Sequence, residues 1–207
     1  MRDQVYLPAN AAIPFLWLCG PSGVGKSSVG WEVFTQVRAA GVTAAYLDTD
    51  QISFCRPEPP DDPDHYALRA RNVAALWPNF LAAGARAMIV SGILETPDGV
   101  RLFTAAVPGA VVTIVRLRAT PVTLQERIFR RGRGGGPPVP GEQEWQGATA
   151  SRLLALWEDS VATAAALARN RIGDVCIDTD GRSVRDVARA ILAQAPGWSH
   201  LRGPAAE

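Results

Sequence analysis

Apolar and polar positions along this chain follow two recurring patterns. Short apolar runs at 15–19, 44–47, 87–90, 111–117 and 175–177 are typical of buried parallel strands. Segments with apolar residues at helical spacing separate these runs and predict helices at 26–40, 65–83, 100–106, 120–131, 148–169 and 183–194. The alternation of strand and helix predicts an α/β fold in which a parallel sheet carries helices on both faces.

Glycine and proline mark the boundaries of these elements. Gly41 is expected to end the first helix, and Pro78 to kink or interrupt the helix at 65–83. The segments 56–63 and 131–142 are predicted to be loops, because they are too rich in proline, aspartate or glycine for regular structure. The tail at 196–207 is expected to be frayed. With no internal repeat and no second set of elements, 1–207 is predicted to be a single domain.

A glycine-rich sequence follows the first predicted strand. Residues 20–27, GPSGVGKS, match the pattern G-x-x-x-x-G-K-[ST] between a strand and a helix. In such a P-loop, backbone N–H groups and the helix N-terminus bind phosphate oxygens. Lys26 would place its charge on the β and γ phosphates, and the Ser27 hydroxyl would bind Mg²⁺. The sequence therefore predicts ATP and Mg²⁺ as cofactors. The predicted nucleotide-binding residues of the loop are Gly20, Ser22, Gly23, Val24, Gly25, Lys26, Ser27 and Ser28.

Composition and charge exclude several classes of protein. The chain has 207 residues, 47% of them hydrophobic, and a formal net charge of +1, so no overall field attracts nucleic acid or an anionic membrane. No segment reaches the roughly 18 consecutive apolar residues that span a bilayer. Three cysteines without Cys-x-x-Cys spacing predict reduced thiols and a cytoplasmic protein. The oligomeric state is left open, with a homodimer as one alternative.

The segment LDTDQI at 47–52 resembles the end of the second strand in P-loop kinases of small metabolites, in particular adenylylsulfate kinase and its gluconate and shikimate kinase relatives. The resemblance extends from about 15 to 192. It implies a three-layer P-loop fold with the five-stranded parallel sheet of nucleoside-monophosphate kinases and a short lid at about 131–145. It also implies that Asp50 is the catalytic base and that Asp48 contacts the substrate. Helix capping or a turn is the alternative role for each aspartate.

The segment 70–97 adds further candidates, because it resembles a helix, strand and turn of the same family. Arg69 and Asn72 are three residues apart and so share one face of the predicted helix. The resemblance implies that these two residues and Ser91 contact the substrate, with an exposed helix face as the alternative for the helical pair. The third strand ends without the aspartate that motor-type P-loop ATPases carry there, and Glu95 is a candidate substitute.

Two later segments complete the resemblance. Residues 118–136 are similar to the family's lid, in which arginines close over the phosphates, and this implies catalytic roles for Arg127 and Arg131. Guanidinium groups match the charge that develops on a transferred phosphoryl group. A solvated basic helix end is the alternative. Residues 174–192 are similar to the closing strand, turn and helix of the family, which implies that Thr179 contacts the adenine base.

Together these observations predict an ATP-dependent kinase that transfers the γ-phosphoryl group to a hydroxyl group of a small-molecule acceptor. The sequence does not identify the acceptor. The arginine pattern argues against adenylylsulfate itself, and a drug-modifying kinase of the chloramphenicol phosphotransferase type remains open. The alternative from another class is a regulatory protein that binds ATP or hydrolyses it slowly. His65, which follows the proline-rich loop, is expected at the surface, with a role in substrate binding as the alternative.

Overall fold

A computed structural model describes residues 12–57, 59–62, 64–135 and 145–198. In this part of the chain, five parallel strands form one sheet in the order β2-β3-β1-β4-β5. The strands are β1 (Ile13–Cys19), β2 (Ala44–Asp48), β3 (Ala87–Ser91), β4 (Ala110–Arg118) and β5 (Val175–Asp178). The predicted fold is therefore confirmed: a five-stranded parallel sheet flanked by helices.

Six α-helices and one 3-10 helix lie between and after the strands within the described residues. They are α1 (Lys26–Ala39), the 3-10 helix η1 (Thr49–Ile52), α2 (Tyr66–Ala82), α3 (Pro97–Ala105), α4 (Pro121–Gly132), α5 (Ala150–Arg169) and α6 (Val184–Gln194). Every strand and α-helix predicted from the sequence is present, with ends shifted by a few residues. None of these helices combines the length and apolar character needed to cross a bilayer.

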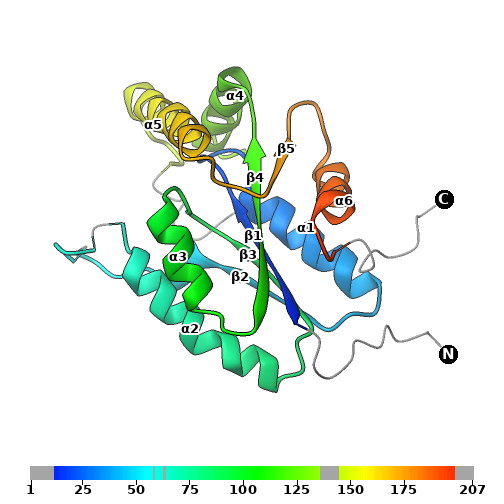
Figure 1. Ribbon diagram of the computed structural model, residues 1–207. Helices are drawn as coiled ribbons and strands as arrows, with labels where there is room; N and C mark the ends of the chain where they lie inside the picture. The colour runs from blue at the N-terminus through cyan, green and yellow to red at the C-terminus, as the bar shows by residue number, and fades with distance from the viewer. Residues whose placement is uncertain (1–11, 58, 63, 136–144, 199–207) are drawn as a thin grey trace.

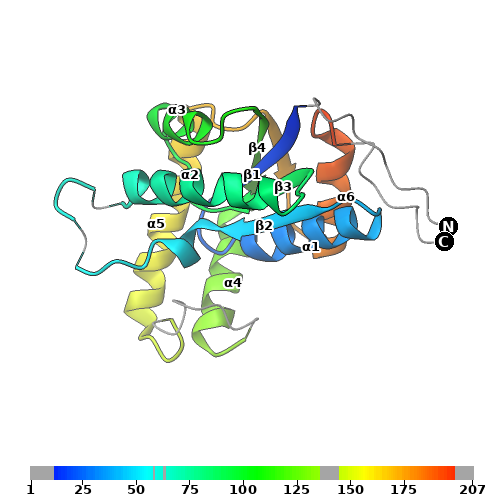
Figure 2. The same cartoon turned by 90° about the horizontal axis from the view of Figure 1, so that it is seen from below.

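The helices form a layer on each face of the sheet. Figures 1 and 2 show α1 and α6 on one face and α2 and α3 on the other. Side chains of the central strand β1 pack alternately against the two helical layers. Leu16 and Leu18 belong to the core beneath α1 and α6, whereas Phe15 and Trp17 belong to the core beneath α2 and α3. This division follows from the period-2 geometry of a strand that is buried on both faces.

Of the two outcomes expected at Pro78, a kink or an interruption of the helix, the interruption does not occur. The helix continues from Tyr66 to Ala82 with Pro78 inside it. Proline removes the N–H that would bond the carbonyl of Ala74, one turn earlier. Both residues are exposed, so water can bond the freed carbonyl. On the opposite face, Val73 and Trp77 are buried, and this packing stabilises the helix through the proline.

Part of the predicted frayed tail is folded. Residues 199–207 lie outside the described part of the chain, but Trp198 is fully buried among the core residues beneath α1 and α6. Burial of a tryptophan side chain removes a large apolar surface from water, which is enough to hold the chain to its core at this point.

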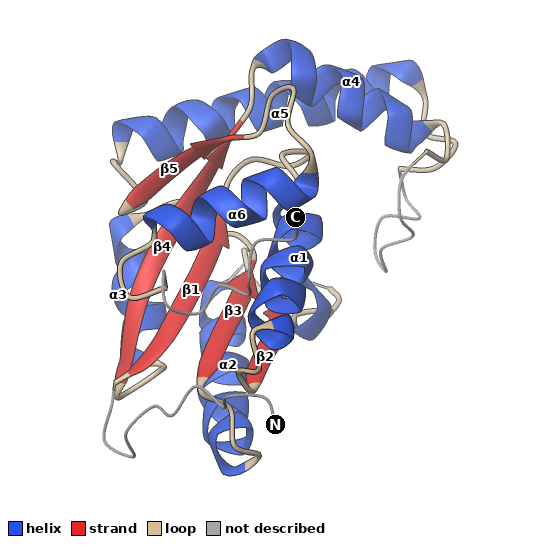
Figure 3. Cartoon of the chain, turned by 90° about the vertical axis from the view of Figure 1, so that its right-hand side faces the viewer, coloured by secondary structure: helices blue, strands red, loops and turns tan. Residues whose placement is uncertain are grey.

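The carboxyl ends of the strands meet at one edge of the sheet, close to α4 and α5 (Figure 3). The P-loop at 20–27 follows β1, Asp48 ends β2, and Ser91 ends β3. In open parallel sheets, ligands bind outside this edge, where neighbouring strands connect in opposite directions. The strand order β2-β3-β1-β4 therefore gathers the predicted site residues at the edge where a ligand is expected.

Candidate active site

The P-loop leaves β1 and turns directly into α1. Gly23 and Gly25 have φ angles of +80° and +103°, in the left-handed region that favours glycine. Gly20, with a φ angle of +147°, is constrained by space as well, because a Cβ atom there would lie 2.7 Å from the Leu117 carbonyl oxygen of β4. These constraints explain why the pattern needs glycine at fixed positions in the loop.

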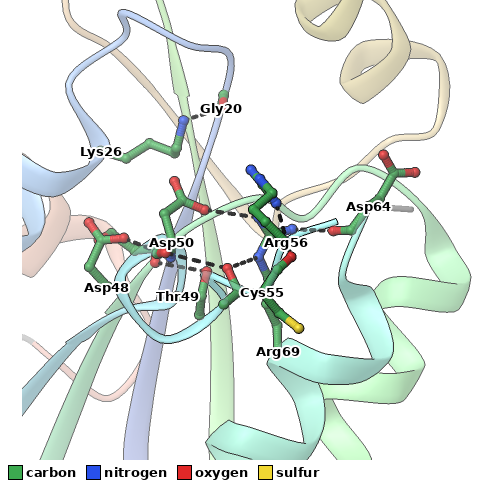
Figure 4. Close-up of polar contacts among 11 residues, drawn as sticks. Gly20, Lys26, Asp48, Thr49, Asp50, Cys55, Arg56, Asp64 and Arg69 are labelled. Atoms are coloured by element: carbon green, nitrogen blue, oxygen red, sulfur yellow. Dashed lines mark hydrogen bonds and ion pairs between the residues drawn. The ribbon is translucent and has the colours of Figure 1, made fainter. Parts of the chain in front are cut away.

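Lys26 is held inside the curve of the P-loop. Its Nζ donates hydrogen bonds to the carbonyl oxygens of Gly20, at 3.0 Å, and Pro21, at 3.2 Å (Figure 4). Burial lowers the pKa of Lys26, while the nearby carboxylates of Asp50 and Asp48 act in the opposite direction. The ammonium group is thus placed at the centre of the loop by the chain itself.

Asp48 and Asp50 flank the start of η1 and have different surroundings. Asp48 is buried and caps η1: its Oδ1 accepts from the Asp50 N–H at 3.0 Å, and its Oδ2 accepts from the Ser91 hydroxyl at 2.9 Å. Both of its oxygens are thus occupied by the chain. The capping role that sequence analysis gave as an alternative is therefore observed for Asp48.

Asp50 faces the space next to Lys26, and 44% of its side chain is exposed. Its Oδ1 lies 3.3 Å from Nη2 of Arg69 (Figure 4). Partial burial in the cleft desolvates the carboxyl group and raises its pKa, as does the charge of Asp48. Lys26 and Arg69 oppose the increase. The geometry suits a carboxylate that accepts a proton from a group bound beside it.

The guanidinium group of Arg69 uses each of its three nitrogens in a hydrogen bond or ion pair within the protein. Besides its ion pair with Asp50, its Nε donates to the Ser53 hydroxyl at 3.2 Å and its Nη1 donates to the Asp64 carbonyl oxygen at 2.5 Å. Its side chain is only 9% exposed. Asn72, one turn further along α2, donates to the Ile52 carbonyl oxygen at 2.5 Å. The two residues do share a helix face, and that face anchors the segment after η1.

Two clefts border the P-loop and have different remaining walls. The first has a volume of about 240 Å³ and the second about 390 Å³. Gly23, Gly25 and Arg131 line both, so the clefts meet at the loop. The other residues that line the first cleft are Ser22, Lys26, Ser27, Asp48, Asp50, Gln51, Ser53, Phe54, Arg56, His65, Arg69, Ile93 and Trp145.

The second cleft is closed on one side by contacts of Arg127. This side chain donates to the Val24 carbonyl oxygen at 3.0 Å and to both the hydroxyl and the carbonyl oxygen of Thr179, at 2.9 and 3.0 Å. Burial lowers the pKa of the guanidinium group. Arg127 therefore joins α4, the P-loop and the turn after β5. Ser28 lines the same cleft, as do Arg130 and Arg182.

Arg131 reaches both clefts from the end of α4. Its guanidinium carbon lies 5.8 Å from the centre of the Trp145 ring, a cation–π geometry. Residues 136–144, the middle of the predicted lid at 131–145, lie outside the described part of the chain. The lid therefore stays a prediction. Its described ends are close together, because the Gly147 N–H donates to the Gly132 carbonyl oxygen at 3.0 Å.

Three candidates from the sequence lie away from the surface of the clefts. Ser91 is fully buried beneath Asp48, and Asn72 and Glu95 line neither cleft. Burial raises the pKa of Glu95, and its backbone is bonded to the hydroxyl of Tyr66 and to Asn170. Among the described residues, no group of three His, Cys, Asp or Glu side chains is arranged to hold a metal ion.

The preferred expectation for His65, a surface position, was wrong, whereas the alternative of a role in substrate binding stays a prediction. His65 is 4% exposed, lies at the start of α2 and lines the first cleft. His65 lies next to a turn that Asp62 organises: the Asp62 carboxylate accepts from the N–H groups of Ala67 and Leu68, and its carbonyl oxygen accepts from the His65 N–H.

The sequence and the structure were also compared with known proteins. A family model described as an AAA domain matches residues 15–154. No curated protein matches the sequence. A sugar kinase from Janibacter sp. HTCC2649 is similar in structure, with a TM-score of 0.58 and 16% identity over 91% of this chain and 95% of that chain.

Two further solved structures are similar. The APS kinase of Mycobacterium tuberculosis, in complex with AMPPNP and APS, has a TM-score of 0.57 and 20% identity over 88% of this chain and 96% of that chain. A gluconokinase from Sinorhizobium meliloti 1021 has a TM-score of 0.53 and 18% identity over 92% of each chain. At these identities the likeness shows the fold, which is that of P-loop small-molecule kinases.

Proposed function

This chain belongs to the AAA domain family, and we propose that it is an ATP-dependent kinase that transfers the γ-phosphoryl group to a hydroxyl group of a small-molecule acceptor. The observation that carries the proposal is the pair of clefts that meet at the P-loop. A phosphoryl transfer needs a donor and an acceptor on either side of one phosphate, and residues of the P-loop line both clefts.

The second cleft is the proposed site of the nucleoside. Thr179 and Arg127 form its wall, and Ser28 and Val24 connect it to the P-loop. The loop fits phosphate, because its curve already holds the Lys26 ammonium group and its glycines leave the backbone open on the inner side. Gly20, Ser22, Gly23 and Gly25 would then bind phosphate oxygens through their N–H groups, as proposed from the sequence.

The residues beside the loop also fit a magnesium ion. Ser27 and the carboxylate of Asp50 line the same cleft, and oxygen ligands of this kind suit Mg²⁺, which commonly binds one or two protein groups together with phosphates. The Ser27 hydroxyl would hold the ion. When bound, Mg²⁺ neutralises charge on the phosphates. This role requires no larger cluster of acidic residues.

The first cleft is the proposed site of the acceptor. Asp50 would accept the proton of the acceptor hydroxyl while the acceptor oxygen bonds to the γ-phosphorus and ADP leaves. Lys26 and Arg131 would stabilise the charge on the transferred group, since both line the first cleft next to the P-loop. Arg69 would orient Asp50. His65, Gln51 and Arg56 are proposed as polar contacts of the acceptor, which gives the first cleft its specificity.

An acceptor screen tests the proposal. Purified protein, ATP and Mg²⁺ are incubated with separate polyhydroxy compounds, including sugars, D-gluconate, nucleosides and adenylylsulfate, and ADP formation is followed together with the mass of the product. We expect one class of acceptor to raise ADP formation sharply and to gain one phosphoryl group. The deoxy analogue, which lacks the accepting hydroxyl, should leave the rate at its acceptor-free value.

Two results would count against the kinase proposal. A rate of ADP formation that no acceptor changes would favour the other candidate, a regulatory protein that hydrolyses ATP slowly. Retention of activity in the Lys26→Ala variant would show that the measured turnover does not come from the P-loop.

A further inference from the structure

A chain of buried hydrogen bonds runs beneath Asp50 and links it to the start of α1. The Tyr46 hydroxyl lies 2.8 Å from the Ser91 hydroxyl, which is 2.9 Å from Oδ2 of Asp48. Oδ1 of Asp48 then accepts from the Asp50 N–H at 3.0 Å. At the other end, the Tyr46 hydroxyl lies 3.3 Å from the Ser27 carbonyl oxygen. We call these residues the Tyr46–Ser91–Asp48 chain.

The chemistry of the three groups fixes the direction of donation. The carboxylate of Asp48 can only accept, so Ser91 must use its one hydroxyl proton on Asp48. Ser91 therefore accepts in its contact with Tyr46, and Tyr46 is the donor. Tyr46 has only this one proton, so its longer contact with the Ser27 carbonyl oxygen, at 3.3 Å, competes with the contact to Ser91 and is the weaker of the two. Burial and the charge of Asp48 raise the pKa of Tyr46, so this donor keeps its proton. Each donor polarises the next bond, and all of them lead to the carboxylate that holds the Asp50 N–H.

Residues of α1 leave room for the Tyr46–Ser91–Asp48 chain and shield it from solvent. Gly30 lies in the middle of α1, where glycine is unfavourable, and a Cβ atom there would approach the Tyr46 ring to 2.9 Å. The rings of Trp31 and Phe34 lie 5.5 and 6.2 Å from that of Tyr46. Gly30 thus lets the edge strand β2 place a tyrosine hydroxyl against Ser91, and aromatic rings cover it.

The ends of β2 and β3 are also interlocked at the backbone. The Thr49 hydroxyl donates to the Ser91 carbonyl oxygen at 3.3 Å, and a Cβ atom on Gly92 would lie only 1.8 Å from that hydroxyl oxygen. The residue between the two aspartates is therefore fixed to the same strand end as Asp48. This close approach makes the position of Asp50 depend on β3 as well as on β2.

From these contacts we infer that Tyr46 and Ser91 are positioning residues that act on Asp50 through Asp48. The inference rests on the proposed function, in which Asp50 receives the proton of the acceptor hydroxyl. It assigns to Ser91 a role other than the substrate contact implied by the sequence, and it assigns a role to Tyr46, which no sequence motif includes. Tyr46 and Asp48 belong to β2 and Ser91 ends β3, so the chain holds the proposed base to the ends of these two strands.

The test compares Ser91→Ala and Tyr46→Phe with Tyr66→Phe as the matched control. Tyr66 also has a partly buried hydroxyl, which accepts a hydrogen bond from the backbone N–H of Glu95. It is not part of the Tyr46–Ser91–Asp48 chain. Amide hydrogen exchange of Asp50 is measured by NMR, with the Gly99 amide, which the Thr96 hydroxyl caps, as an internal reference. Loss of one hydrogen bond of ordinary strength should speed Asp50 exchange about fivefold in Ser91→Ala, and less in Tyr46→Phe.

Enzyme kinetics provide the second readout, which separates an effect on the alignment of Asp50 from an effect on nucleotide binding. With an acceptor found by the screen, we expect Ser91→Ala and Tyr46→Phe to lower kcat while the KM for ATP and the Kd for a fluorescent ATP analogue stay unchanged. Tyr66→Phe should change none of these quantities. The inference would be overturned if the Asp50 amide of Ser91→Ala exchanged at the wild-type rate. It would also be overturned if the Gly99 amide of this variant exchanged faster by the same factor as the Asp50 amide.

The exchange readout needs no acceptor, so the inference can fail or stand independently of the proposed function. If no acceptor is phosphorylated, the kinase proposal fails, whereas faster exchange confined to Asp50 would still show that the Tyr46–Ser91–Asp48 chain holds this residue. If an acceptor is phosphorylated and both variants keep the wild-type kcat, positioning is refuted while the kinase proposal stands.

Discussion

Charged side chains at this site are placed by backbone carbonyl groups as much as by one another. Lys26 bonds the carbonyl oxygens of Gly20 and Pro21, Arg69 bonds that of Asp64, and Arg127 bonds those of Val24 and Thr179. Each cation is therefore in position before any ligand binds. Because little side-chain freedom remains to be lost, this preorganisation lowers the cost of binding a highly charged substrate.

The substitution Lys26→Ala should abolish nucleotide turnover and leave the fold intact. The lysine makes two hydrogen bonds to its own loop, while the core beneath α1 does not depend on it. Turnover with ATP and other nucleoside triphosphates, together with circular dichroism and thermal unfolding, checks both parts. A variant that retains wild-type turnover would contradict the assignment.

Asp50→Asn should lower kcat by about 10²- to 10⁴-fold, the usual contribution of a general base, with little change in ATP affinity. The comparison is between kcat and the Kd for ATP in the same preparation. Asn keeps the shape of the side chain and can still accept from Arg69, but it cannot take up a proton. A loss that falls only on ATP affinity would show that Asp50 serves the nucleotide, and Asp48 and Glu95 would be the next carboxylates to test.

The pH dependence of kcat follows from the raised pKa of Asp50. The ionised form is the base, so activity should rise with pH through this pKa, and burial moves the rise above the ordinary range of aspartate. At lower pH the protonated form accumulates and activity falls. A pH–rate profile of the wild type should show this acid limb, and the residual activity of Asp50→Asn should lack it. An acid limb of equal position in the variant would assign the titration to another group.

At the scale of elements, close approach between α1 and the sheet decides what α1 can contain. Val29, Val33 and Val37 form its buried stripe, and Gly30 lies beside the stripe where Tyr46 of β2 and Ser91 of β3 reach the helix. A glycine costs an exposed helix about 1 kcal/mol relative to alanine. Here that cost is compensated by the packing of the two strands against α1.

Gly30→Ala should therefore destabilise the protein, although alanine is the better helix former. The new methyl group would lie 2.9 Å from the Tyr46 ring, and overpacking of this kind typically costs about 1 to 3 kcal/mol, reduced here by about 1 kcal/mol of helix propensity. Urea unfolding measures the net change. In a Tyr46→Ala background the clash is gone, so the same substitution should become neutral or stabilising. Equal destabilisation in both backgrounds would show that the ring is not the cause.

For the whole molecule, the P-loop is the point that both clefts share. β1 in the centre of the sheet carries it, α1 follows it, and Arg127 connects it to the turn after β5. A nucleotide bound there would contact elements from both halves of the chain. Ligand binding to the folded state alone should then stabilise the molecule as a unit.

ATP with Mg²⁺ should raise the unfolding temperature. At a concentration of about 100 times Kd the linkage is worth about 2.7 kcal/mol, which corresponds to roughly 5 to 10 °C for a chain of this size. Differential scanning fluorimetry with and without ATP and Mg²⁺ checks this. The Lys26→Ala variant should lose most of the shift, whereas Asp50→Asn should keep it. No shift in the wild type would contradict nucleotide binding at the P-loop.

The sequence by itself determined the elements, the P-loop and the strand ends that carry Asp48, Asp50 and Ser91. These features depend on local rules: apolar periodicity, the φ preferences of glycine and proline, and fixed spacing within a motif. Pro78 does not end the helix, as its local preference would allow, because packing of α2 outweighs the missing hydrogen bond. The family resemblance added the candidate roles of the arginines and of Thr179.

Only the tertiary structure decided which of these side chains meet. Asp50 and Arg69 are 19 residues apart, Arg127 and Thr179 are 52 apart, and Tyr46 and Ser91 are 45 apart. Such contacts depend on the strand order, which places β3 between β2 and β1, and on the depth to which each helix packs. Local sequence does not encode either property, because both result from the joint burial of apolar surfaces contributed by the whole chain.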